Sequence, residues 1–119
     1  MPARTVGRIT RRAAFAELQR SRARGSRGPV RVSFVPADSG DRGVFPQVGY
    51  AIGRNCGSAV VRNRLRRRAR EVVRASAPTL PRGSYLVRLE PAAVGRPPSV
   101  LRDDVAAALR KASQPRVGA

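Results

Sequence analysis

Arginine is the residue type with the clearest chemical potential in this sequence, and it is concentrated in one short stretch. The segment AVVRNRLRRRAREVVR, residues 59–74, contains seven arginines and a single acidic residue, Glu71. Guanidinium groups bind phosphates through paired, planar hydrogen bonds, and Asn63 adds a donor or acceptor for a base edge or a ribose hydroxyl. This composition predicts a binding site for a polyanion of the nucleic-acid type.

The same segment has the periodicity of an amphipathic helix, and we expect the side chain of Ser58 to cap its start. At about 100° per residue, one stripe is apolar and consists of Val61, Leu65, Ala69 and Val72. A ridge beside this stripe is cationic and consists of Arg62, Arg66, Arg70 and Arg74. Glu71 can pair locally with Arg67 or Arg74, but like charges three and four residues apart oppose helix formation. The ridge therefore costs stability unless an anion neutralises it.

The composition of the whole chain also indicates a polyanionic partner. Its 119 residues carry a formal net charge of +18, with 25 Lys and Arg against 7 Asp and Glu. A surplus of this size favours nucleic acid or an anionic membrane surface as the partner. A membrane-bound helix would need bulky apolar residues on its inserting face, whereas the apolar stripe of residues 61–72 suits packing on a sheet.

The length and hydrophobicity favour one ordinary domain with a single core. Hydrophobic residues make up 41% of the chain, which is close to the share in globular proteins. No segment reaches the ~20 apolar residues of a membrane span or has the pattern of a signal peptide. We therefore expect one cytoplasmic RNA-binding domain over residues 1–119, with its core at about 6–112 and a flexible tail at 113–119.

The residue types that would make the chain itself a nuclease are missing or scattered. It has no histidine and one cysteine, Cys56, so a Cys/His metal site and an intramolecular disulfide are excluded. Asp103 and Asp104 are expected in the first turn of a helix, where they favour its dipole. The other acidic residues are far apart in sequence and are Glu17, Asp38, Asp41, Glu71 and Glu90. We predict no catalytic residue, metal or cofactor on the protein's side chains.

Several flanking elements must position the arginine segment. A helix is predicted from Thr10, as its N-cap, to about Ser21, and the basic stretch RSRARGSRG, residues 20–28, is predicted to be a loop. Alternation in PVRVSFV, QVGYAIG and SYLVRLE predicts three strands, whose inward residues are Val30, Val32, Phe34, Val48, Tyr50, Ile52, Tyr85, Val87 and Leu89.

The second of these strands has an almost bare opposite face of Gly49, Ala51 and Gly53, which lets a helix or a ligand approach its backbone. Ser99 is expected to cap a last helix whose inner stripe is Leu101, Val105, Ala108, Leu109 and Ala112. The order helix, strands, helix, strand, helix favours an α+β fold, an α/β sandwich with one sheet packed by helices.

On these residues the chain resembles the bacterial ribonuclease P protein component family. The resemblance is carried by GSAVVRNRLRRRARE, residues 57–71, and by the preceding VGYAIGRNCGSAVV, and it extends from about Val6 to Ala112. It implies a domain shaped like one from a ribosomal small-subunit protein. One mixed four-stranded sheet would be packed by helices, with a left-handed βαβ crossover.

The resemblance further implies a subunit of the ribonuclease P endoribonuclease. The protein would bind the catalytic RNA and the 5′ leader of precursor tRNA, and the RNA would hold the Mg²⁺ and hydrolyse the phosphodiester that joins the leader. The protein alone would be non-catalytic, and it would be a monomer within the ribonucleoprotein. A general or ribosome-associated RNA-binding protein of the same fold is the alternative.

Carried over by position, the residues expected to contact the catalytic RNA are Arg62, Asn63, Arg64, Arg66, Arg67 and Arg70, joined by Arg54, Asn55 and Arg74 of the same basic region. Phe15 and Tyr50 match aromatic positions of the leader cleft, where stacking contributes about 1–3 kcal/mol per base, and plain core packing is the alternative for both. The chain departs from the family pattern at Gly53, at Gln19, which replaces a second aromatic, and at Glu90, which replaces an arginine.

Overall fold

Two neighbouring strands form the centre of the sheet in the computed structural model, which describes residues 6–9, 12–37 and 46–114. Strands β3 (Val30–Pro36) and β5 (Gly83–Leu89) are antiparallel neighbours. Their inward side chains are buried, and the rings of Phe34 and Tyr85 stack with centroids 4.6 Å apart. The Tyr85 hydroxyl donates a hydrogen bond to the carbonyl of Pro81 at 2.6 Å, so this buried phenol has its polar partner.

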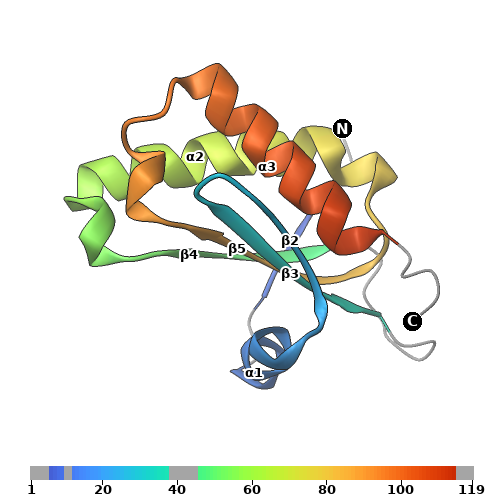
Figure 1. The fold of residues 1–119 in the computed structure, drawn as a ribbon. Helices are drawn as coiled ribbons and strands as arrows, with labels where there is room; N and C mark the ends of the chain where they lie inside the picture. Colours follow the sequence, from blue (N-terminus) through green and yellow to red (C-terminus); the bar gives the residue numbers. More distant parts are fainter. Residues whose placement is uncertain (1–5, 10–11, 38–45, 115–119) are drawn as a thin grey trace, which may run out of the picture.

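The sheet is mixed and lies between two layers of helices. Its strand order is β1-β4-β5-β3-β2, with β1 at Gly7–Arg8, β2 at Ala23–Arg27 and β4 at Gln47–Ile52. Helices α2 (Ala59–Ser76) and α3 (Pro98–Ser113) cover one face, and α1 (Arg12–Arg20) lies on the other (Figure 1). The predicted mixed four-stranded sheet is confirmed in β2 to β5, and the two-residue β1 extends it beside β4.

The crossover that carries α2 joins β4 to β5, which are parallel neighbours. The chain leaves β4 through the short 3₁₀ turn η1 (Arg54–Cys56), runs along α2 and returns through η2 (Ala77–Thr79). A hairpin joins strands that run in opposite directions. Parallel neighbours therefore need a longer crossover connection. The left hand of this crossover stays a prediction from the resemblance.

The predicted loop at 20–28 is wrong, because Ala23–Arg27 forms β2, the edge strand paired antiparallel with β3. Gly25 explains how so polar a segment becomes a strand. A Cβ atom there would lie 2.5 Å from the backbone nitrogen of Ala112, so the absence of a side chain lets α3 pack directly on β2. Gly28, with a φ of +56°, opens the two-residue turn that leads to β3.

The helices differ from prediction in smaller ways. Helix α3 begins at Pro98 after Pro97, so Ser99 is inside the helix and is not its cap, because a proline at the first position already starts it. Asp103 and Asp104 therefore lie beyond the first turn. The predicted inner stripe of α3 is buried as expected. In α2 the buried residues are Leu65, Ala69 and Val73, with Val61 and Val72 half-buried.

Two cores result from this layering. The larger one lies between the sheet and helices α2 and α3, and the smaller one consists of Ile9, Leu18 and Leu86 on the α1 side. The expected cap Thr10 and residues 115–119 of the expected tail lie outside the described residues, while α3 continues to Ser113. No helix in the described ranges is both long and apolar enough to cross a membrane.

Candidate nucleic-acid interface

Helix α2 is fixed at its start and along one side, which determines where its arginines point. The Ser58 hydroxyl accepts a hydrogen bond from the Val61 amide at 3.4 Å, so the predicted cap is confirmed. Because Leu65 and Ala69 are buried against the sheet, the other side of the helix faces outward. Most arginines there are exposed, and the half-buried ones are Arg62, Arg66 and Arg68.

The arginines of α2 are not neutralised by neighbouring acids in the described part of the chain. Glu71 pairs with Arg102 of α3, with Nη2 and Oε2 3.2 Å apart. The predicted local pairing of Glu71 with Arg67 or Arg74 is therefore wrong, because α3 brings a cation closer. None of the described ion pairs includes an α2 arginine. The helix consequently presents an uncompensated positive surface.

A shallow hollow of about 550 Å³ lies on this surface, and we call it the α2 hollow. It is lined by Val60, Asn63, Arg64, Arg66, Arg67 and Arg70. Within it, Arg66 Nη1 donates a hydrogen bond to Asn63 Oδ1 at 2.8 Å, which fixes the two side chains relative to each other. Val60 is 66% exposed, so the hollow offers an apolar surface to a base or ribose beside its cations.

A second hollow, of about 650 Å³, lies at the carboxyl ends of the parallel strands β4 and β5, and we call it the end hollow. Its polar lining includes Tyr50, Asn55, Arg66, Arg88 and Glu90. Tyr50 is half-buried on the α2 side of the sheet, and the Arg70 guanidinium lies 5.9 Å from its ring centroid. Burial raises the pKa of Tyr50, and the charges of Arg70 and Arg74 lower that pKa by less.

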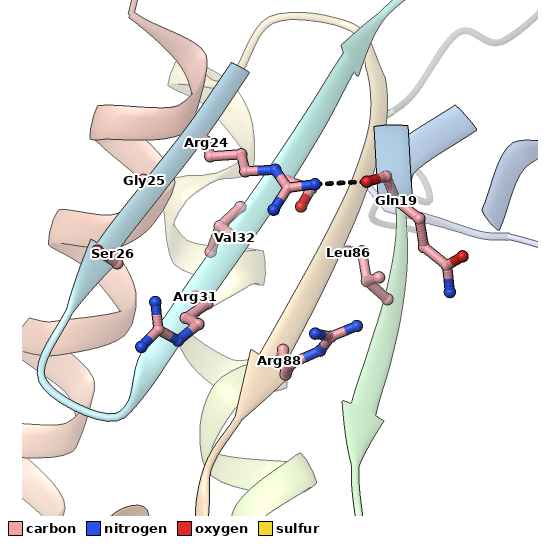
Figure 2. Close-up of a pocket in the computed structure, with 9 residues that line it drawn as sticks. Gln19, Arg24, Gly25, Ser26, Arg31, Val32, Leu86 and Arg88 are labelled. Carbon is pink, nitrogen blue, oxygen red and sulfur yellow. Dashed lines mark hydrogen bonds between the residues drawn. The ribbon is translucent and has the colours of Figure 1, made fainter. Parts of the chain in front are cut away.

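A third hollow, of about 400 Å³, lies on the opposite face of the sheet beside α1, and we call it the sheet hollow (Figure 2). Its lining includes Gln19, Arg24, Arg31, Ser33, Leu86 and Arg88. Arg24 Nε donates a hydrogen bond to the Ser21 carbonyl at 2.8 Å, and its Nη2 donates to that of Gln19. These bonds tie β2 to the end of α1 and hold the two sides of the hollow together.

The structure brings most, but not all, of the predicted site residues together. Five of the predicted α2 residues line the α2 hollow. The Nε atom of Arg62 is buried and has no hydrogen-bond partner. Asn55 lines the end hollow. Arg54 and Arg74 are exposed on η1 and α2. Tyr50 lies on the face of the sheet opposite α1, so the two predicted leader residues come from different sides. The side chain of Phe15 lies outside the described residues.

Sequence reasoning missed the cations of the sheet hollow. For Arg31 and Arg88 a signal is present, because both alternate with buried neighbours in their strands and therefore point outward. Arg24 gave no usable signal, because its segment was predicted to be a loop. The paired strands show that outward charges from three strands meet on one face.

Comparison with known proteins agrees with this arrangement. The family model named Ribonuclease P matches residues 4–113, which is nearly the whole chain and includes every hollow described above. The chain belongs to the ribonuclease P protein component family. It is accordingly a protein subunit of the ribonuclease P endoribonuclease.

Relatives within the family include the ribonuclease P protein components of Thermobifida fusca and Acidothermus cellulolyticus. The first is 38% identical over 114 residues, which cover 92% of this chain and 78% of the relative. The second is 41% identical over 87 residues, 72% of this chain and 71% of the relative. The solved structure of the Staphylococcus aureus RNase P protein has a TM-score of 0.71 at 18% identity, covering 87% of this chain and 92% of that one. At that identity the likeness concerns the fold, and the predicted α/β sandwich is confirmed.

Proposed function

We propose that the chain binds the catalytic RNA of ribonuclease P through α2 and the 5′ leader of precursor tRNA through the hollows beside the sheet. The observation that carries the first part is the outer side of α2, where arginines line a hollow with no acidic partner among the described residues. Such a surface is stabilised by phosphates, and each phosphate that it neutralises releases counterions.

The leader is single-stranded, and the lining of the sheet hollow suits a single strand. Next to Leu86 and Arg88 of β5, the neighbouring strand β4 presents the small residues Gly49 and Ala51 on this face, so no large side chain stands beside these two lining residues. Leu86 supplies an apolar surface for bases, and Arg24, Arg31 and Arg88 supply cations for phosphates. A groove with both features holds unpaired strands with little dependence on their sequence.

The protein contributes positive charge and the RNA contributes the chemistry in this proposal. The described residues contain no group of three His, Cys, Asp or Glu side chains placed to hold a metal ion. We propose that the Mg²⁺ of the reaction is held mainly by RNA, and that the protein reduces repulsion between two RNAs brought close together. We also propose that one copy of the protein acts in each ribonucleoprotein, in the cytoplasm.

Competitive binding distinguishes this proposal from a general RNA-binding role. Labelled ribonuclease P RNA from the same organism is bound to the protein, and unlabelled ribosomal RNA of similar length competes at rising salt concentration. We expect the ribonuclease P RNA to stay bound at salt concentrations that release ribosomal RNA. Equal competition at every salt concentration would favour a general or ribosome-associated RNA-binding protein.

A further inference from the structure

The three hollows are connected through shared residues. Arg66 lines both the α2 hollow and the end hollow, and Arg88 lines both the end hollow and the sheet hollow. The end hollow contains Tyr50 from the α2 face and Arg88 from the α1 face, so it passes around the ends of β4 and β5 from one face of the sheet to the other. A flexible polyanion could follow this path without leaving the positively charged surface.

Arg88 stands at the junction of the end hollow and the sheet hollow. It lies directly opposite Arg31 of β3 and beside Ala51 of β4, and Figure 2 shows Arg31 and Arg88 along the sheet hollow. Like charges directly opposite each other destabilise an antiparallel pair. The small side chain of Ala51 leaves space next to Arg88. Arg88 is exposed and takes part in none of the described ion pairs, so its charge is available to a phosphate.

Glu90 forms an ion pair with Arg31, and none of the described ion pairs joins Glu90 to Arg88. Arg31 Nε lies 2.5 Å from Glu90 Oε1, and this pair connects the lining of the sheet hollow to that of the end hollow. Glu90 is the one acidic residue among the described linings of the three hollows. Both side chains of the pair are well exposed, so the pair contributes little to stability. The negative charge of Glu90 acts instead on a ligand that lies along this surface.

We propose that the end hollow and the sheet hollow form one continuous track for a single RNA strand, with Arg88 binding a phosphate at the junction and Glu90 weakening binding there. Glu90 does so by occupying Arg31 and by placing a negative charge beside the strand. This inference rests on the proposed function, because it describes how the same strand would cross the protein.

The test measures the affinity of the full chain for labelled oligouridylates from about two to about ten nucleotides long, a length range suited to grooves of this kind. We expect the affinity of the unchanged protein to rise in a step once the strand is long enough to cross the junction. Arg88→Ala should remove this step, weakening long strands by on the order of tenfold and leaving the shortest unaffected. Glu90→Gln should strengthen long strands by about threefold and steepen their salt dependence by about one unit.

Matched control variants remove the same charges elsewhere. Arg110 and Asp103 are exposed on α3 and line none of the three hollows, so Arg110→Ala and Asp103→Asn account for the change in net charge. Thermal unfolding of each variant verifies the fold. If Arg88→Ala binds long strands like Arg110→Ala, or if Glu90→Gln binds them more weakly than Asp103→Asn, the inference is overturned while the proposed function stands. If the unchanged protein binds no oligouridylate at all, leader binding is overturned as well.

Discussion

The guanidinium of Arg70 lies over the ring of Tyr50, 5.9 Å from the ring centroid. This contact joins the cationic side of α2 to β4, and it places a residue expected to bind the catalytic RNA against one expected to bind the leader. A cation over an aromatic face is favourable by about 0.5–1 kcal/mol at an exposed site. The two expected RNA-binding surfaces are therefore in physical contact through these side chains.

The pKa of Tyr50 should report this contact. Burial raises it above the ordinary value of 10.0, and the charge of Arg70 lowers it by a smaller amount. Arg70→Ala should therefore raise the pKa of Tyr50 further. The chain has two tyrosines, so absorbance titration of the phenolate in a Tyr85→Phe background isolates Tyr50. Arg64→Ala is the control on the same helix, and an equal midpoint in both variants would show that Arg70 does not lie over the ring.

Alkaline pH should destabilise the fold through both tyrosines. Burial also raises the pKa of Tyr85, so each phenol loses its proton more readily in the unfolded chain than in the native one. The free energy of unfolding is thus maintained below pH about 10 and falls as the pH rises through the native pKa values. Denaturant unfolding of the unchanged protein and of Tyr85→Phe across this range measures the effect. A constant free energy of unfolding would contradict it.

The cationic side of α2 should control assembly with RNA. Replacing Arg62 and Arg66 with alanine should weaken binding of ribonuclease P RNA and reduce the slope of log affinity against log salt by about one to two units, because about two phosphate contacts are lost. Arg110 together with Lys111 of α3 is the matched pair for the control. An unchanged slope and affinity would show that this side of the helix does not bind the RNA.

Phe15 remains a predicted leader residue on α1. Phe15→Ala should weaken binding of precursor tRNA that carries a leader by about 1–3 kcal/mol, the contribution of one lost base stack. Binding of mature tRNA should be nearly unaffected. Parallel binding curves for the two tRNAs with the assembled ribonucleoprotein test this. Equal losses for both tRNAs would mean that Phe15 packs in the core and does not contact the leader.

Gly25 should be required for the close contact between β2 and α3. A Cβ atom at this position would lie 2.5 Å from the Ala112 backbone nitrogen and 2.6 Å from the Lys111 Cβ, so Gly25→Ala must displace α3. We expect a loss of about 1–3 kcal/mol in the free energy of unfolding, the usual cost of overpacking. Gly95 has open space where its Cβ would be, so Gly95→Ala is the control and should be neutral or slightly stabilising. Equal stability of the two variants would contradict this packing.

The parts of the fold that sequence could predict are those with a strong local pattern. Alternation located β3, β4 and β5, and the 3.6-residue period with Ser58 located α2. The segment that became β2 has no such pattern, because its stability comes from pairing with β3 and from contact with α3 at Gly25. Local propensity carries no information about contacts of that kind.

The site was predictable to a similar degree. The α2 arginines follow from charge and spacing within one helix, so they could be identified from the sequence. The partner of Glu71 could not, because Arg102 is brought close only by the packing of α2 on α3. Likewise, the meeting of Arg24, Arg31 and Arg88 in one hollow depends on the register of three strands.

Cleavage of precursor tRNA at low magnesium concentration tests directly whether the protein assists the catalytic RNA. Three reactions are compared, containing ribonuclease P RNA from the same organism alone, this protein alone, and the two together. We predict efficient cleavage at the leader junction only in the mixture, because the protein's charge replaces part of the magnesium that the two RNAs otherwise need. A mixture that cleaves no better than the RNA alone, while the protein still binds that RNA, would contradict the assignment.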